Sequence, residues 1–318
     1  MPPQQQYKST LEEIEYIKYA FPRLLKERLG FIRVSSPIFL EKSSGLNDDL
    51  NGVEEKVSFT HKGKVMEVVQ SLAKWKRVAL KKYNIKALYA DMNAIRKDEN
   101  VDKTHSMYVD QWDWEMVEEQ GPEHVVEVVN TIHSCIYDLE TELLKFMYPN
   151  ISDEELENKK IIPKTITFIT SEALRKKYPN ISARERENKI AKLHKAVFIQ
   201  QIGKELGDGS IHDSRAPDYD DWDNNGDIIY WSDALNESLE ISSMGYRVNK
   251  DTLVPQLQKV HAVDRLENPY CKMIMNDELP QTIGGGIGQS RLCMLLMQRK
   301  HISEVQSGYW DDPVADAL

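Results

Sequence analysis

The sequence contains little cysteine, no long apolar run and no excess of basic charge, and each absence excludes a class of protein. Its 318 residues include three cysteines, Cys135, Cys271 and Cys293, which lie far apart and form no Cys-x-x-Cys pair. This pattern indicates a reducing compartment and argues against a thiolate metal site. No apolar run approaches the ~20 residues that a membrane span needs, and the first residues lack the basic start and apolar core of a secretory signal. We therefore expect a cytoplasmic protein with no membrane partner.

The charge balance argues against a nucleic-acid partner. The 41 basic and 51 acidic side chains leave a net charge of −10, which disfavours a chain-wide electrostatic grip on a phosphate backbone. The eight histidines include no His-Glu-x-x-His, and no Gly-x-Ser-x-Gly is present. A zinc site and a serine nucleophile are therefore both unsupported.

Hydrophobic periodicity predicts an α+β protein with a mixed or antiparallel sheet and helices packed around it. Helices are predicted over residues 9–29 (with a kink or break at Pro22 and a stop at Gly30), 70–82, 123–147, 182–195 (opened by a Ser182 and Glu185 capping box), 251–276 and 288–298. Strands are predicted over residues 31–40, 65–69, 108–116, 196–202, 227–231 and 238–248. No Gly-, Ser- or Pro-rich linker divides the chain, so we expect a single domain over residues 1–318, with residues 1–6 disordered.

The strand predicted over residues 108–116 has two chemically different faces. Alternation points Trp112 and Trp114 one way and Gln111, Asp113 and Glu115 the other. The tryptophans indicate that their side is the core. The polar face then lines something specific rather than an open surface.

Arg96 lies shortly before this strand, in a loop expected between two strands. A guanidinium in such a loop can hold a phosphate as a forked donor. The alternative is a solvated charge run, since Lys97, Asp98 and Glu99 follow directly.

A glycine-rich segment, residues 284–288, leads into the last predicted helix. Without Cβ atoms it can let a flat ligand or a phosphate approach the backbone, and a helix start favours anions. The spacing matches neither a P-loop nor the dinucleotide fingerprint. A tight strand-to-helix turn packed against a neighbour explains the same residues equally well.

Two acidic segments are candidate cation sites. Six aspartates lie within residues 213–227, and residues 221–228 copy the start of an EF-hand loop, but Ser232 stands where the bidentate glutamate belongs. We therefore do not expect a calcium loop. Further on, Glu240 and Ser242 are predicted to share a strand face, where they could hold Mg²⁺ against phosphates, although a capped strand end is the better explanation.

Several segments combine into one recognisable pattern. They are Ser35-Ser36-Pro37 after a long helix, Arg96-x-x-Glu99 before a strand, Gly-x-Gly-x-x-Arg ending at Arg291, and the stretches SLAKWKR (71–77), YVDQWDWE (108–115), RAPDYDDW (215–222), NGDI (225–228), SSMG (242–245) and PQTIGGGIGQSRL (280–292). The first three resemble the signature motifs of class II aminoacyl-tRNA synthetases. The whole set resembles the ammonia-dependent asparagine synthetases of the A type, over roughly residues 7–310.

This resemblance implies a homodimer built on an antiparallel sheet flanked by helices. It implies ATP-dependent synthesis of L-asparagine from L-aspartate and ammonia through a β-aspartyl-adenylate, with AMP and pyrophosphate released and Mg²⁺ as cofactor. One alternative is a freestanding aspartyl- or asparaginyl-tRNA synthetase-like domain, although the chain has no spare ~100 residues for an anticodon-binding barrel. The other is a non-catalytic relative that binds aspartate or nucleotide.

The resemblance also implies the residues of the site. Catalytic roles fall to Asp48, Arg96 and Gln111, with Asp48, or Asp49 beside it, taking a proton from ammonium. The substrate-binding residues are Ser71, Lys76, Asp113, Arg215, Asp220, Ser242 and Ser243. The ATP-binding residues are Arg96, Asp227, Glu240, Gly286, Gly288 and Arg291. Asp227 and Glu240 would also hold the Mg²⁺.

Overall fold

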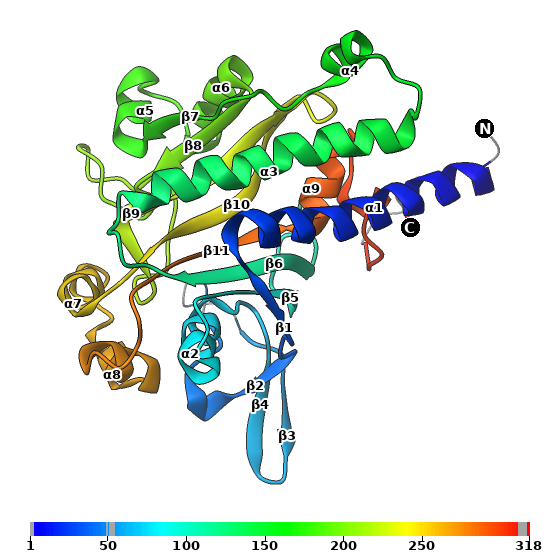
Figure 1. Ribbon diagram of the computed structural model, residues 1–318. Helices are drawn as coiled ribbons and strands as arrows, with labels where there is room; N and C mark the ends of the chain where they lie inside the picture. The colour runs from blue at the N-terminus through cyan, green and yellow to red at the C-terminus, as the bar shows by residue number, and fades with distance from the viewer. Residues whose placement is uncertain (1–2, 49, 51–54, 311–316) are drawn as a thin grey trace.

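The computed structural model describes residues 3–48, 50, 55–310 and 317–318. Its centre is an eight-stranded sheet with the strand order β1, β5, β6, β11, β10, β9, β8 and β7 (Figure 1). The inner strands pair antiparallel, while β1 and β7 at the edges pair parallel with their neighbours. The strands are β1 Ile32–Val34, β5 Ala87–Ile95, β6 Tyr108–Val117, β7 Thr167–Thr170, β8 Ala196–Gln200, β9 Asp220–Ser232, β10 Glu237–Arg247 and β11 Thr282–Gly288. The expected α+β class with a mainly antiparallel sheet is confirmed.

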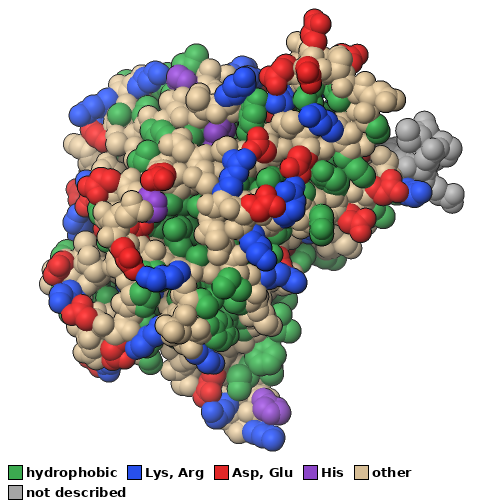
Figure 2. All heavy atoms as spheres, in the orientation of Figure 1, with side chains coloured by type: hydrophobic (Ala, Val, Ile, Leu, Met, Phe, Trp, Pro, Cys, Tyr) green, Lys and Arg blue, Asp and Glu red, His purple; other side chains and the backbone are tan. Residues whose placement is uncertain are grey.

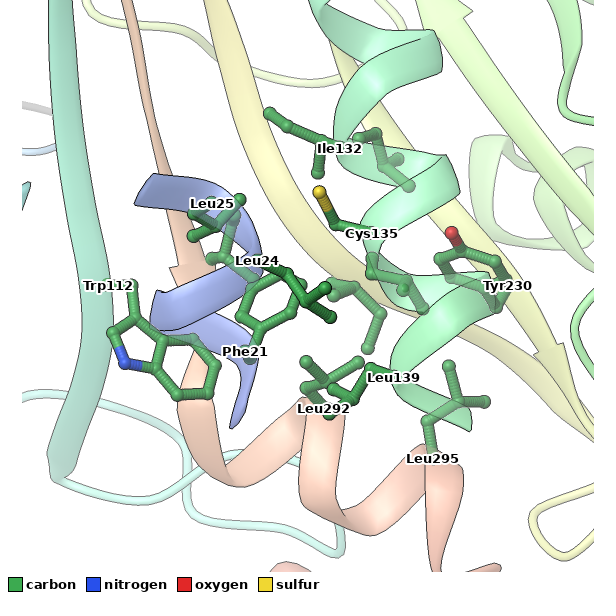
Figure 3. Packing of buried hydrophobic residues seen from close by; sticks show 14 of the residues in the cluster. Phe21, Leu24, Leu25, Trp112, Ile132, Cys135, Leu139, Tyr230, Leu292 and Leu295 are labelled. Carbon is green, nitrogen blue, oxygen red and sulfur yellow. The ribbon is translucent and has the colours of Figure 1, made fainter. Parts of the chain in front are cut away.

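Two long helices, α1 and α3, lie side by side across one face of this sheet (Figure 1). Together with α9 they bury the largest apolar cluster, in which Phe21, Trp112, Leu139 and Leu292 meet (Figure 3). The helices are α1 Pro3–Leu29, α2 Ala73–Tyr83, α3 His124–Met147, α4 Asp153–Lys159, α5 Ser171–Lys177, α6 Ala183–His194, α7 Lys250–Lys259, α8 Pro269–Met275 and α9 Gln289–Leu296, with 3₁₀ turns η1 Lys42–Ser44, η2 Val263–Glu267 and η3 Ile302–Glu304. In the described part of the chain, no helix is long and apolar enough to cross a membrane.

Among the described residues, the helices on the opposite face of the sheet pack at its two ends. Alternation along β8 sends Phe198 into the cluster under α3, and sends Val197 and Ile199 into a second cluster with α5 and α6. At the other end, α2 contacts β5, β6 and β11. The middle of this face, over β6, β11 and β10, carries a pocket.

A small second sheet projects from the lower end of the molecule in Figure 1. It consists of β2 Phe39–Glu41, β4 Lys64–Val68 and β3 Ser58–His61, all antiparallel. The strand expected at residues 65–69 is β4. The extended segment expected at residues 31–40 divides into β1 and β2.

Helix α1 departs from its prediction in two ways. It continues unbroken through Pro22, because Phe21, Leu24 and Leu25 on either side are anchored in the core and offset the missing N–H of proline. It also begins at Pro3, so residues 3–6 are helical rather than disordered, while residues 1–2 lie outside the described part. The predicted stop is confirmed, since Gly30 has φ +69° and donates its N–H to the Lys26 carbonyl at 3.0 Å.

The strand predictions miss β3, β5, β7 and β11 and shorten β9. Residues 221–232, which imitate an EF-hand loop, lie inside β9, so extended backbone stands where a calcium loop would have to turn. The predicted helix start at Ser182 is confirmed: Ser182 Oγ accepts from the Glu185 N–H at 3.3 Å, and Glu185 Oε2 accepts from the Ser182 N–H at 2.8 Å.

One buried carboxylate in α3 should make stability depend on pH. Glu140 accepts the N–H groups of Ile161 and Ile162 at 2.7 and 3.1 Å, and burial raises the pKa of this carboxyl to about 7. The folded chain therefore binds this proton more tightly than the unfolded chain. The resulting stabilisation is complete below about pH 4.5 and is lost as the pH rises through about 7.

As the pH rises through about 7, we expect the free energy of unfolding to fall less in Glu140→Gln than in the parent protein. Urea titrations at pH 5, 6 and about 7.5 measure it. Glu142→Gln serves as the control, because Glu142 lies on the same helix but pairs near the surface with Arg23. Equal pH slopes for the parent protein and Glu140→Gln would contradict the prediction.

Candidate active site

The pocket has a volume of about 570 Å³ and lies on the face of the sheet opposite α1 and α3. Three strands form its floor, and the start of α2 and the loops at residues 96–106 and 213–219 form its walls. The residues expected at the site that line it are Ser71, Lys76, Arg96, Gln111, Asp113, Arg215, Asp220, Glu240, Ser243, Gly286, Gly288 and Arg291. Those that do not line it are Asp48, Asp227 and Ser242.

Strand β6 supplies one side of the floor as its alternation predicts. Trp112 and Trp114 are buried in the core against α1 and α3, while Gln111 and Asp113 line the pocket. Glu115, next along the polar face, is fully buried below them. The polar face is therefore not an open surface but lines a pocket, and the ligand that this pocket takes stays a prediction.

The glycine segment is a central strand, β11, between β6 and β10. A Cβ at Gly284 would overlap the Glu115 carboxylate, and a Cβ at Gly286 would overlap the Gln111 amide. The absence of side chains therefore lets the polar side chains of β6 lie over bare backbone. Close packing against neighbours is confirmed, although in a strand rather than a turn, and approach of a ligand to this backbone stays a prediction.

A chain of buried ion pairs runs under the pocket. The Lys76 ammonium, 1% exposed, contacts Asp113, lies 3.9 Å from Glu115 and donates to the Gly285 carbonyl at 2.9 Å. Burial lowers the pKa of Lys76 against the opposing charges of Asp113 and Glu115. Arg247 then pairs with Glu115 at 2.8 Å and with Asp220.

This chain of charges holds Glu115 ionised. Burial by itself would raise the pKa of Glu115, but the Arg247 guanidinium and Lys76 outweigh it and keep the pKa below its ordinary value. Arg247 is a pocket residue that the sequence analysis missed. Arg247 lies in strand β10, four residues after Ser243. Residues four apart on a strand share a face, so this spacing could have identified Arg247 from the sequence.

Two carboxylates meet at the far side of the pocket. The Ser243 hydroxyl lies 2.7 Å from Asp227 Oδ1 and 3.2 Å from Glu240 Oε1. Burial raises the pKa of Asp227 to about 6, with the Arg215 guanidinium opposing and the Glu240 charge adding to the rise. A cation between the two carboxylates would relieve this repulsion.

The pair fits a magnesium ion that is shared with phosphates. Mg²⁺ commonly takes one or two carboxylates and completes its shell with water and substrate oxygens. Within the described residues no cluster of three or more His, Cys, Asp or Glu side chains could hold a metal ion. Asp227 and Glu240, which meet through the Ser243 hydroxyl, are the carboxylate pair that fits this way of binding.

A β-bulge overturns the expectation that Glu240 and Ser242 share a face. The register against β9 shifts between these two residues, from Glu240 opposite Ile229 to Ser242 opposite Ile228. The extra residue reverses the alternation, so Ser243 joins Glu240 in the pocket. The Ser242 hydroxyl is buried without a hydrogen-bond partner in the described chain.

Arg96 differs from the other arginines of the pocket. Arg215, Arg247 and Arg291 all contact carboxylates. The structure gives the Arg96 guanidinium no hydrogen bond or ion pair with a described residue, and its Nε is buried without a partner. It is a half-buried cation available to an anionic ligand.

Arg291 and His105 occupy the mouth of the pocket above Glu240. Arg291 donates to the Thr104 carbonyl at 3.3 Å and to the Glu240 carbonyl at 3.2 Å. His105, which the sequence analysis did not select, lines the pocket with its Nδ1 2.9 Å from Asp102. The interaction with His105 is one of the causes that lower the pKa of Glu240. No motif in the sequence indicated this histidine.

Asp48 lies behind the pocket wall. Its carboxylate is 0% exposed and lies 3.7 Å from the Lys74 ammonium. Tyr219 lines the pocket and lies close enough to Asp48 for that charge to act on its phenol. Burial and the Asp48 charge both raise the pKa of Tyr219. The alternative base, Asp49, lies outside the described residues.

Comparison with known proteins gives one consistent result for the sequence. The profile of the family described as aspartate-ammonia ligase matches residues 8–318. An aspartate–ammonia ligase of Clostridium tetani is 46% identical over 96% of this chain and 90% of its own length. Another, of Ligilactobacillus salivarius, is 49% identical over 98% of this chain and 93% of its own length.

Solved structures with the same fold are more distant. The asparaginyl-tRNA synthetase of Entamoeba histolytica in complex with asparaginyl-adenylate superposes with a TM-score of 0.69 at 12% identity. The corresponding complex from Pyrococcus horikoshii also gives 0.69, at 13% identity. The matches cover 95% and 94% of this chain but 66% and 67% of those synthetases, so this chain spans about two thirds of their length. At this identity the likeness concerns the fold.

Proposed function

This chain belongs to the aspartate–ammonia ligase family, and we propose that its pocket makes L-asparagine through a β-aspartyl-adenylate. The overall reaction joins L-aspartate and ammonia and converts ATP to AMP and pyrophosphate. The observation that carries the residue assignments is Arg96, an arginine with no partner among the described residues, in the same pocket as the Lys76 and Asp113 pair and Glu240, whose carboxylate the Ser243 hydroxyl joins to Asp227.

The first step makes the side-chain carboxyl of aspartate reactive. A carboxylate is a poor electrophile, so one of its oxygens attacks the α-phosphorus of ATP and pyrophosphate leaves. Arg96 would grip the α-phosphate as a forked donor and stabilise the charge that builds on it. Arg291 would stack on the adenine, and Gly286 and Gly288 leave room for the nucleotide.

The phosphates also need a divalent cation. Asp227 and Glu240 would hold Mg²⁺, which neutralises phosphate charge when bound. The Ser243 hydroxyl already joins these two carboxylates. Arg215, which contacts Asp227, would fix the orientation of that carboxylate.

Aspartate carries both signs of charge, and so does the floor of the pocket. The substrate carboxylates would bind the cationic Lys76 and Arg215, and the substrate ammonium would bind Asp113 or Asp220. The remaining contacts are polar and come from Ser71, Gln111 and Ser243. Because the buried ion pairs fix these groups before the substrate arrives, little reorganisation would be needed.

The second step captures the activated carbonyl with ammonia. At neutral pH ammonia is present mostly as ammonium, so a base beside its entry route should accelerate the step. We assign this base to Asp48. The ammonia nitrogen then attacks the β-carbonyl carbon, and AMP leaves with one former carboxylate oxygen.

Asp48→Asn should therefore separate the two steps. Aspartate-dependent exchange of pyrophosphate with ATP stays within about 3-fold of the parent, while asparagine formation falls by ~100-fold or more, the usual size of a general-base contribution. Both rates are measured on the same protein at the same pH. Equal losses in the two assays would remove Asp48 from the base role.

A homodimer, a cytoplasmic location and a single catalytic domain over residues 1–318 complete the proposal. Large apolar side chains are exposed around β1 and on the small sheet, namely Ile32, Ile38, Phe39, Phe59 and Val65, and Figure 2 shows apolar atoms over this lower region. Such a surface supports contact with a second copy. The three cysteines are buried and free, as a reducing compartment allows.

The products identify the activity. Purified protein with aspartate, ATP, Mg²⁺ and ammonium chloride should release asparagine, AMP and pyrophosphate in equal amounts. ADP in place of AMP would reject the adenylate. Charging of total tRNA with asparagine or aspartate would support the synthetase-like alternative, and calorimetric binding without turnover would support the non-catalytic one.

A further inference from the structure

A second cluster of buried ions lies behind the wall of the pocket, next to Asp48. The Lys74 ammonium is 2.6 Å from Asp218 Oδ2 and 3.7 Å from Asp48 Oδ1. Arg265 adds a second cation, 3.4 Å from the same Asp218 oxygen. The side chains of Lys74 and the two aspartates are at most 3% exposed, and none of the four residues lines the pocket.

The cluster shares one cation unequally between two carboxylates. Asp218 has the closer contact with Lys74 and also has Arg265, yet its Oδ1 has no partner within the described chain. Asp48 has the longer contact with Lys74. The charge of Lys74 that reaches Asp48 therefore depends on how much Asp218 neutralises.

The described residues packed around the cluster come from four segments. The charged and titratable groups packed around the cluster include Lys74 from α2, Asp218 and Tyr219 from the segment before β9, Arg265 from η2 and Cys271 from α8. Burial raises the pKa of Cys271 to about 12 and that of Tyr219 well above its ordinary value. Both are neutral at working pH, so among these described groups the charges that act on Asp48 are those of Lys74, Asp218 and Arg265.

We propose that Lys74 is a positioning residue for the ammonia step, because it keeps Asp48 ionised and fixed behind Tyr219, and that Asp218 limits this effect by competing for the same ammonium. The inference rests on the proposed role of Asp48 as the base. A buried carboxylate without a cation takes up a proton. In that form it can no longer accept one from ammonium.

The two partners should shift the pH dependence of the ammonia step in opposite directions. Asparagine formation is measured from pH 5.5 to 9 at a constant concentration of ammonium, the species from which Asp48 would take the proton. Lys74→Met moves the acid limb of the profile up by about one pH unit, which is ~10-fold in rate well below that limb. Asp218→Asn moves the limb down, because all of the Lys74 charge then acts on Asp48. Lys74→Arg restores the parent profile.

The matched readout is aspartate-dependent exchange of pyrophosphate with ATP, whose pH profile should not move in any variant. Lys81→Met, a control on the same helix at the surface, should leave both profiles unchanged. Parallel losses in both assays with an unmoved acid limb would reduce Lys74 to a structural role and overturn the inference. If Lys74→Met does not fold, an unmoved limb in Asp218→Asn overturns it.

Failure of the inference is distinct from failure of the proposed base. If Asp48→Asn forms asparagine at the parent rate, the base assignment is wrong, and the inference falls with it. If Asp48→Asn loses the ammonia step but neither partner variant shifts the limb, the base stands and only the role of Lys74 is overturned.

Discussion

Replacing Arg96 with alanine will lower aspartate-dependent exchange of pyrophosphate with ATP by at least ~100-fold, as loss of a donor to the transition state does elsewhere. The reason is that Arg96 is the pocket arginine whose guanidinium has no described protein partner. Removing it breaks no ion pair within the described chain, so the temperature of unfolding should change by at most about 2 °C.

Two further variants define the role of Arg96. Arg96→Lys keeps the charge but loses the forked donor, and it should recover only a minor part of the rate. Lys97→Ala removes the neighbouring exposed cation, which pairs with Glu55, and should leave the rate within about 2-fold. An Arg96→Ala protein with near-normal exchange would show that another group grips the α-phosphate.

Replacing Lys76 with methionine will have the largest effect on the fold. The change keeps most of the length of the side chain but leaves Asp113 without its cation and Glu115 with Arg247 as its remaining cation among the described residues. Loss of one partner from a buried pair typically costs about 3–5 kcal/mol of unfolding free energy. We expect a loss of this size in urea titrations, together with a raised KM for aspartate in any protein that remains folded.

The matched control is Lys82→Met, on the same helix but exposed to solvent. It should change the free energy of unfolding by no more than about 0.5 kcal/mol. A Lys76→Met protein as stable as this control would mean that the ion pairs under the pocket contribute nothing to the fold. Normal aspartate binding by such a protein would also remove Lys76 from the substrate site.

The side of the sheet on which the pocket lies could be predicted, because the residues of a single strand, β6, indicate it. The alternation of Trp112 and Trp114 with Gln111 and Asp113 assigns one side of β6 to the core and the other to a site. The structure places the tryptophans against α1 and α3 and the polar residues in the pocket. Local periodicity was sufficient here, since no distant residue had to be known.

Other features depend on contacts that no local pattern contains. The bulge between Glu240 and Ser242 exchanges the faces of residues two apart in sequence, and nothing in the segment signals it. The glycines of β11 were open to two explanations, because their function as bare floor follows from Glu115 and Gln111 on the neighbouring strand. The Lys74 and Asp218 pair joins residues 144 positions apart.

The most direct test of the adenylate is isotopic. Aspartate labelled with ¹⁸O in its β-carboxylate is converted to asparagine, and the products are analysed by mass spectrometry. Because AMP leaves with one oxygen of the former carboxylate, the account predicts one ¹⁸O atom in the phosphate of AMP for each asparagine formed. Label in inorganic phosphate, or AMP without label, would contradict activation of aspartate at the α-phosphate.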